Sequence, residues 1–242
     1  VKTQLEMGGK NALVVLADAD LDLAADAAVG AAYACAGQWC TSTSRVIVAA
    51  PVAEAFERKL VERVAAIRVG DGQRPDTGMG PVCGTAQRDG ILAAIAAATA
   101  AGARLAFGGR RLTADGMERG CFIEPTVFAD VAPTSALARD EIFGPVLALI
   151  RVADFAEAVA VSNDVEFGLC SSIYTASLAH ALQFVERSEV GVAHVNLPTS
   201  LKEPQLPFGG IKRSGFGTPE AGHAGVEFFT RHQAVYVRFA AG

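Results

Sequence analysis

The sequence predicts an α/β fold of three layers, in which helices cover both faces of an open, mostly parallel, twisted sheet. Short apolar runs alternate with segments of helical periodicity along the chain, which is the pattern of repeated strand and helix units. A chain of 242 residues with 51% hydrophobic residues can also bury a large core. We therefore expect one large domain over residues 1–226 and a C-terminal tail over residues 227–242.

The first half of the chain contains two strand and helix units. The apolar run at residues 11–16 predicts a buried strand. Asp18 and Asp20 then offer N-cap oxygens to a helix that we expect to reach about position 36. A second strand is predicted at residues 45–49, and Pro51 is placed to open the next helix. The apolar residues expected on one face of that helix are Phe56, Leu60, Val64 and Ile67.

The second half repeats the pattern after a loop at residues 70–81, which is rich in Gly, Pro and Asp. Helices are predicted at residues 87–101, 154–163 and 177–187, and strands at residues 104–107, 146–151, 171–174 and 192–196. Residues 197–217 lose periodicity and predict a long functional loop. The tail ends in alternating apolar residues, so we expect it to add a strand to a neighbouring sheet.

The composition argues against several classes of function. The net charge is −5 and no run of like charge could follow a phosphate backbone, so nucleic acid is not an expected partner. No apolar run approaches the roughly 20 residues that cross a bilayer, and the first residues lack a signal-peptide pattern, so we expect no membrane partner and a cytoplasmic location. The five cysteines lack metal-ligand spacing, which predicts reduced thiols and no metal site.

Cys40 is the first candidate for chemistry. It lies in the sequence GQWCT between a predicted helix and a predicted strand, where Gly37 lets backbone amides come close to the sulfur. Nearby dipoles lower the pKa of such a thiol and favour the nucleophilic thiolate. A buried core cysteine is the alternative interpretation, and the local context alone does not decide between the two.

Glu6 is the second candidate. It lies in LEMGGK, where an acid precedes a glycine pair and a strand. A carboxyl group beside an apolar turn has a raised pKa and can act as a general base toward water. A solvated surface glutamate is the alternative, so this motif too decides nothing alone.

Four motifs that follow one another along the chain support Cys40 and Glu6 as functional residues. They are EMGGK at 6–10, GQWCT at 37–41, EIFGP at 141–145 and PFGGIKRSGFG at 207–217. Together they resemble the aldehyde dehydrogenase superfamily, and the resemblance covers the whole chain. It implies that residues 1–226 are the thiol-bearing catalytic domain of the non-acylating, NAD(P)-dependent members. Because the chain begins with Val inside a motif, we expect a portion of a longer protein whose N-terminal cofactor domain lies outside it.

The resemblance implies a covalent mechanism. The Cys40 thiolate would add to an aldehyde carbonyl to give a thiohemiacetal, and hydride transfer to the nicotinamide of NAD or NADP would leave a thioester. Glu6 would then deprotonate the water that hydrolyses the thioester. The backbone N–H of Cys40 would supply one oxyanion donor, and an asparagine outside this chain would supply the other.

The resemblance also implies residues that hold the cofactor. Glu141 and Phe143 match positions that bind the nicotinamide ribose and flank the nicotinamide ring, although EIFGP could simply be a turn before a strand. Gly8 and Gly9 match backbone that passes close to the nicotinamide.

Residues around the substrate follow from the same resemblance. Trp39, Thr41 and Phe208 are expected to contact the aldehyde. A cation at Lys202 could attract the distal carboxylate of a semialdehyde or oxo acid, whereas the alternative is an ordinary solvated lysine. Cys35, Cys83, Cys121 and Cys170 are interpreted as packing residues.

Other functions remain open at this point. The chain could be an inactive or structural module whose tail strand joins a partner, or a thiol esterase that needs no cofactor. A coenzyme A-acylating enzyme is disfavoured because it does not need Glu6. We expect a homo-oligomer, a dimer or tetramer joined through the tail strand. The isolated chain is not expected to oxidise aldehydes.

Overall fold

A twisted sheet of seven strands forms the centre of the protein, as seen in a computed structural model that describes residues 1–114 and 116–240. The strand order is β4-β5-β6-β3-β2-β8-β9. All neighbouring strands are parallel except β4 and β5. The strands are β2 (Asn11–Val15), β3 (Thr43–Ala49), β4 (Arg104–Phe107), β5 (Thr126–Ala129), β6 (Val146–Val152), β8 (Cys170–Tyr174) and β9 (Val192–Val195). The predicted mostly parallel sheet is confirmed.

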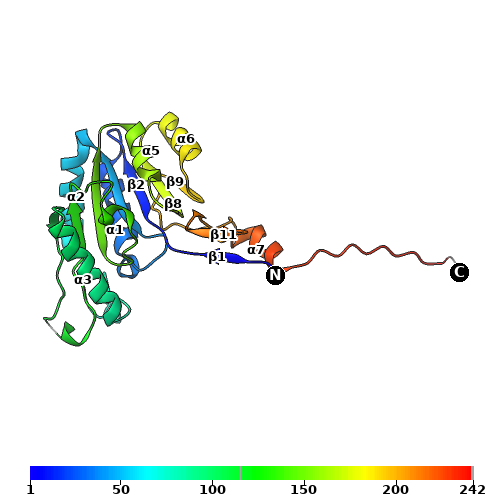
Figure 1. Cartoon of the computed structure of the whole chain (residues 1–242), viewed down its shortest axis with the longest axis horizontal. Coiled ribbons are helices and arrows are strands. Elements are labelled where there is room, and N and C mark those ends of the chain that lie inside the picture. The colour runs from blue at the N-terminus through cyan, green and yellow to red at the C-terminus, as the bar shows by residue number, and fades with distance from the viewer. Residues whose placement is uncertain (115, 241–242) are drawn as a thin grey trace.

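Helices cover both faces of this sheet (Figure 1). On one face α1 (Leu21–Tyr33) packs against α2 (Ala53–Ala65), and on the other α5 (Phe155–Asn163) packs against α6 (Leu178–Arg187). The chain moves along the sheet in opposite directions through the two pairs. Right-handed crossovers therefore place the pairs on opposite faces. The remaining helices are α3 (Thr85–Ala100), α4 (Ala136–Arg139) and α7 (Gly222–Phe229).

The local sequence explains the first unit of the sheet. All five residues of β2 are buried, as expected for a strand covered on both faces. The Asp20 side chain accepts hydrogen bonds from the N–H groups of Asp22 and Leu23 and so caps α1. Buried alanines such as Ala24 and Ala28 form the inner face of α1, which lets the helix approach the sheet closely.

Several elements differ from the prediction. The helix expected to reach position 36 ends at Tyr33, and a 3₁₀ turn (Ala34–Gly37) with left-handed backbone follows it. Strand β5 was not predicted, because its four residues are all buried and show no alternation. The predicted loop at residues 197–217 contains two short strands, β10 (Ile211–Lys212) and β11 (Gly215–Gly217).

These short strands join distant parts of the chain. Strand β11 pairs antiparallel with β1 (Gln4–Glu6), and β10 pairs antiparallel with β7 (Phe167–Gly168). The register of the first pair places Glu6 opposite Gly215. The N-terminal motif is thereby fixed to the PFGGIKRSGFG segment.

The C-terminal tail leaves the body of the protein after α7 (Figure 1). Helix α7 includes residues 227–229 of the predicted tail, and residues 230–240 contain neither helix nor strand. The tail exposes the large apolar side chains of Val235, Tyr236, Val237 and Phe239. Its role as an added strand stays a prediction. None of the helices among the described residues has both the length and the apolar character needed to span a membrane.

Candidate active site

The motif residues gather at the amino-terminal edge of the parallel strands. Gly8 and Gly9 precede β2, Cys40 precedes β3, and Glu141 and Phe143 precede β6. In open α/β sheets, ligands usually bind at the carboxyl ends of the strands. The candidate site therefore lies at the edge that this general rule would not have selected.

A left-handed turn directs the chain from α1 into the loop that carries Cys40. Cys35, Ala36 and Gly37 have φ angles of 52°, 55° and 68°. Left-handed backbone costs roughly 1–2 kcal/mol for a residue other than glycine, so packing must hold this turn. A Cβ atom at Gly37 would overlap the backbone of Gly144, which explains the glycine. The turn thus brings the GQWCT loop against the EIFGP segment.

The side chain of Asn11 fixes the backbone around Cys40. Its Nδ2 donates to the carbonyl oxygens of Cys40 and Ser42, both at 2.8 Å, and its Oδ1 accepts from the N–H of Cys170 at 3.3 Å. The residue is only 3% exposed. Asn11 was missed as a site residue, and its only signal in the sequence is a polar residue at the start of an apolar strand.

Arg45 anchors the neighbouring strand to the GGK segment. Its guanidinium donates to the carbonyl of Lys10 at 3.0 and 2.8 Å, and to the carbonyls of Val161 and Ser162 at 2.9 Å each. Burial lowers the pKa of this group to about 10, but it stays charged at neutral pH. Arg45 therefore joins the backbone before β2 to the end of α5, a role not predicted from the sequence.

Thr41 differs from the prediction that it contacts substrate. It is 1% exposed and lies beneath the site. The Thr199 hydroxyl donates to its carbonyl at 2.8 Å and also lies 2.8 Å from the hydroxyl of Thr43. The observed position indicates that Thr41 supports the loop from below.

Cys40 is half-buried and packs against a small apolar cluster of Leu169, Cys170 and Phe208. Contrary to the lowered pKa expected from the sequence, the pKa of the Cys40 thiol is raised, mainly by burial and further by the Glu6 carboxylate. The Lys202 ammonium and the backbone N–H groups of Thr41 and Cys40 act in the opposite direction. Cys40 and Glu6 are thus close enough to interact electrostatically, as the prediction of a shared site requires.

Glu6 faces the PFGG segment on the other side of this site. A Cβ atom built on Gly209 would lie 3.1 Å from the Glu6 Oε1. Burial raises the pKa of the Glu6 carboxyl group, the nearby Glu220 carboxylate raises it further, and Lys202 opposes both. A raised pKa suits a carboxylate that takes a proton from water.

Glu220 is a further residue that the sequence did not reveal. Its backbone exchanges two hydrogen bonds of 2.7 Å with that of Phe208. This bridge holds Glu220 beside the PFGG segment and brings its charge near Glu6. No motif or spacing in the sequence indicated this position.

Lys202 lies over two aromatic rings next to Cys40. Its Nζ is 4.0 Å from the centroid of the Phe208 ring and 5.7 Å from that of Trp39. Lys202 and Phe208 line a hollow of about 770 Å³, which also includes Leu201 and Leu206. The residues predicted to contact substrate are therefore brought together, with the exception of Thr41.

Three of the four residues predicted to hold the cofactor, Gly9, Glu141 and Phe143, share a second hollow, which also includes Trp39. The Gly9 N–H donates to the Glu141 carboxylate at 2.8 Å, and a Cβ atom at Gly8 would overlap that carboxylate. Phe143 has a φ of 55° and is 40% exposed. The structure thus brings an exposed aromatic ring, a carboxylate and a glycine backbone together, and their role in cofactor binding stays a prediction.

Lys10 is a buried residue in the lining of this hollow, and it was not predicted as a site residue. Burial, assisted by Arg45, lowers its pKa to about 7, while Asp140 and Glu141 oppose the shift. Its side chain lines the hollow together with Glu141. Lys10 thus places a titratable group behind the candidate cofactor residues.

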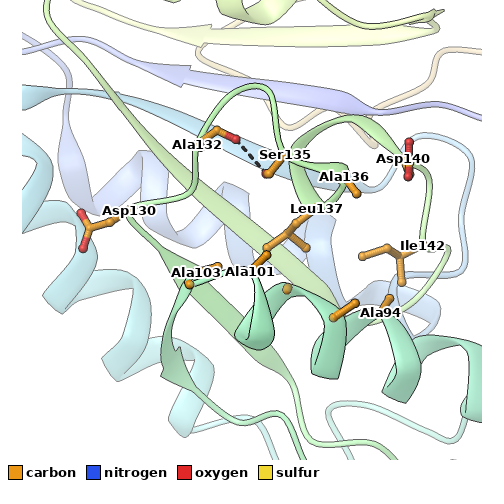
Figure 2. A pocket seen from close by; sticks show the side chains of 13 residues that line it. Ala94, Ala101, Ala103, Asp130, Ala132, Ser135, Ala136, Leu137, Asp140 and Ile142 are labelled. Atoms are coloured by element: carbon orange, nitrogen blue, oxygen red, sulfur yellow. Dashed lines mark hydrogen bonds between the residues drawn. The ribbon is translucent and has the colours of Figure 1, made fainter.

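A third hollow, of about 340 Å³, lies between α3 and the segment that leads to EIFGP (Figure 2). Its lining is mostly alanine and includes Leu137 and Ile142. Asp130 at one end is paired with Arg104 and Arg151. No cysteine among the described residues lines this hollow, so it lacks the thiol that the candidate active site requires.

The other cysteines only partly fit the prediction that they are packing residues. Cys170 is buried, and burial raises the pKa of its thiol strongly. Cys121 is half-buried. Cys35 and Cys83 are exposed, so the prediction is wrong for these two. No group of three or more potential metal ligands lies together in residues 1–114 and 116–240.

Comparison with known proteins gives a consistent result. The profile of the Aldehyde dehydrogenase family matches residues 1–235. The Alpha-ketoglutaric semialdehyde dehydrogenase of Bacillus subtilis is 40% identical over 237 residues, which are 98% of this chain and 49% of that protein. A Betaine aldehyde dehydrogenase of Cereibacter sphaeroides is 42% identical over 233 residues, which are 96% of this chain and 47% of that protein.

Solved structures show the same relationship. An NAD-dependent aldehyde dehydrogenase from Sinorhizobium meliloti superposes with a TM-score of 0.91 and 37% identity, covering 98% of this chain and 47% of that one. A betaine aldehyde dehydrogenase from Staphylococcus aureus in complex with NAD+ superposes with a TM-score of 0.90 and 35% identity. The match covers 93% of this chain and 44% of that one. The chain spans about half the length of the curated relatives it matches.

Proposed function

The chain belongs to the aldehyde dehydrogenase family, and from that premise we propose that it is the C-terminal catalytic half of an enzyme that oxidises an aldehyde to a carboxylic acid with NAD or NADP. The observation that carries the proposal is that Cys40 packs against the cluster that contains Phe208, while a Cβ atom on the next residue, Gly209, would lie 3.1 Å from the Glu6 Oε1, so both groups flank the PFGG segment. A nucleophile and a base at a shared site are the two groups that a covalent route through a thioester needs.

Cys40 forms the covalent bond in this proposal. Its thiolate adds to the aldehyde carbon, and the carbonyl electron pair moves to oxygen to give a thiohemiacetal. The backbone N–H of Cys40 stabilises this oxyanion. NAD or NADP, when bound, supplies the hydride acceptor that turns the thiohemiacetal into a thioester.

Glu6 completes the reaction in this proposal. Its carboxylate takes a proton from water while the water oxygen attacks the thioester carbon. The bond between carbon and sulfur then breaks, which releases the acid and restores the Cys40 thiolate. The raised pKa of Glu6 supports this role, since a stronger base removes the proton more readily.

We assign the cofactor contacts to Glu141, Phe143, Gly8 and Gly9. The carboxylate accepts from the ribose hydroxyls, the ring flanks the nicotinamide, and the glycines allow close approach of the backbone. These residues fit only the nicotinamide end of the cofactor. For this reason we expect the 242-residue chain alone to bind NAD too weakly to oxidise aldehydes.

We propose a small anionic semialdehyde as the substrate. The names of the relatives include both a semialdehyde and betaine aldehyde, and the sequence identities of 40% and 42% do not separate the two. The Lys202 ammonium beside Cys40 favours a substrate with a carboxylate.

A second candidate function is cofactor-free ester hydrolysis. It is supported by the presence of both Cys40 and Glu6 in this chain, because acylation of a thiol by an ester and hydrolysis of the resulting thioester need no hydride acceptor.

Hydrolysis of 4-nitrophenyl acetate by the 242-residue chain tests the proposed site without the cofactor. We expect Cys40→Ala to reduce the rate by at least about 100-fold, because the nucleophile is lost. The matched control is Cys83→Ala, which removes an exposed thiol outside the site and should leave the rate unchanged. An unchanged rate in Cys40→Ala would refute Cys40 as the nucleophile.

A further inference from the structure

The two aromatic rings beside Cys40 form a cage that already contains a cation. The Lys202 Nζ lies 4.0 Å from the centroid of Phe208 and 5.7 Å from that of Trp39. Both distances are within the range of about 6 Å over which a ring attracts a cation. Aromatic cages of this kind bind quaternary ammonium groups when they are empty.

We propose that Lys202, held between Trp39 and Phe208, is the specificity-determining residue of this site. By occupying the cage it excludes aldehydes with a quaternary ammonium group, and by its charge it selects aldehydes with a distal carboxylate. This inference rests on the proposed function, because it concerns the aldehyde that would react with Cys40. It names Lys202 as the residue that determines whether the site accepts a cationic or an anionic aldehyde.

The hydrogen bonds of Lys202 support the selection of a carboxylate. An ammonium group has three N–H donors, and aromatic rings satisfy only part of this capacity. Among the hydrogen bonds and ion pairs of the described residues, none involves the Lys202 ammonium. A carboxylate on the substrate supplies the missing acceptor and forms a charge-assisted hydrogen bond.

The charges that act on Glu6 and Cys40 place the positive charge at Lys202, while Glu203 next to it also lines the hollow. Glu6 and Glu220 place negative charge on the side of the base, where they would repel an anionic group. Lys202 is the cation that acts on both Glu6 and Cys40. This hollow, of about 770 Å³, lies on the side of Lys202 and Phe208 and gives solvent-exposed space next to the ammonium group.

Two thiol reagents that differ in charge test this inference on the 242-residue chain. Methanethiosulfonates that carry either a sulfonate or a trimethylammonium group react with Cys40, and digestion followed by mass spectrometry gives the rate at each cysteine. Dividing each rate by that of the exposed Cys83 in the same molecule removes the intrinsic difference between the reagents. The ratio of the two corrected rates also cancels any change in the thiolate fraction of Cys40.

We expect the sulfonate reagent to be preferred at Cys40, and we expect Lys202→Ala to lower that preference by about fivefold or more, the effect of one exposed ion pair. Lys202→Arg, which keeps the charge, should retain the preference. The control Lys59→Ala removes a cation that pairs with Asp22 on the helices and should have no effect. Buried Cys170 should stay unlabelled in every variant if the fold is intact.

Two results would overturn the inference. One is an unchanged preference in Lys202→Ala, and the other is an equal loss in Lys202→Ala and Lys202→Arg, because charge would then not be the cause. A chain that hydrolyses 4-nitrophenyl acetate through Cys40 and yet shows no charge preference would refute this inference alone and leave the proposed function standing.

Discussion

At the scale of single residues, Cys40 lies among groups that shift its pKa in opposite directions. Burial and Glu6 raise the pKa, whereas Lys202 and two backbone N–H groups lower it. The thiolate needed for attack is therefore controlled by two side chains that come from distant parts of the sequence. Removing each of them should change the reactivity of Cys40 with opposite sign.

We predict that Glu6→Gln lowers the pKa of Cys40 and that Lys202→Met raises it. Loss of the carboxylate removes a charge that disfavours the thiolate, so alkylation of Cys40 at neutral pH becomes faster. Loss of the ammonium removes a charge that favours the thiolate, so alkylation becomes slower. The pH dependence of alkylation by the neutral reagent iodoacetamide measures both shifts. Shifts of the same sign, or none, would contradict the shared site.

The residues around Cys40 also show what the sequence did and did not reveal. Cys40, Glu6, Glu141 and Phe143 were found because they lie in motifs. Arg45 was not found, because its role depends on carbonyl groups as far as 117 residues away in the sequence. Contacts over such distances leave no local pattern, so Asn11 and Glu220 were missed for the same reason, whereas Lys10 lies in the EMGGK motif and only its burial could not be seen from the sequence.

At the scale of elements, the long helices and central strands were predictable because their apolar residues follow a regular period. Helix α2 buries Phe56, Leu60 and Val64 on one face, as predicted, whereas Ile67, which was also expected on this face, lies beyond the end of the helix. The short paired strands β1 and β11 have three residues each and show no period. They are defined only by pairing across the fold, and this pairing positions Glu6.

Arg45 provides a test of how elements are held together at the site. We predict that Arg45→Met lowers the free energy of unfolding by about 3 kcal/mol or more, because three carbonyl groups lose their donor and three of the four hydrogen bonds are buried. The loss should be visible in urea unfolding followed by circular dichroism.

The matched control for this variant is Arg110→Met. Arg110 is exposed and pairs with Glu124 at 3.1 Å. An exposed ion pair contributes roughly 0–1 kcal/mol, so this change should have little effect. Equal losses in the two variants would show that the buried hydrogen bonds of Arg45 do not contribute as described.

At the scale of the whole molecule, the tail is the feature that the single chain leaves unexplained. Residues 230–240 expose several large apolar side chains and make no strand within the chain. The strands β4 and β9 at the two edges of the sheet each have one neighbour in it. We propose that the tail adds a strand to the sheet of a second copy.

Deleting residues 230–242 should therefore convert a dimer or tetramer into a monomer. The reason is that the added strand and its apolar side chains are lost from the interface. Sedimentation velocity over a range of protein concentrations measures the change, with Arg238→Ala as a control that keeps the length of the tail. A full-length chain that is already monomeric, or a deletion variant that stays oligomeric, would refute the tail strand.

The most direct test of the central claim, that Cys40 and Glu6 act in succession on one carbon atom, is burst kinetics with 4-nitrophenyl acetate in Glu6→Gln. The account predicts a rapid release of about one 4-nitrophenol per chain, followed by a steady rate at least about 100-fold below that of the unmodified protein, since hydrolysis loses its base. Mass spectrometry should then find the acetyl group on Cys40. A steady rate equal to that of the unmodified protein, or an acetyl group on another residue, would contradict the account.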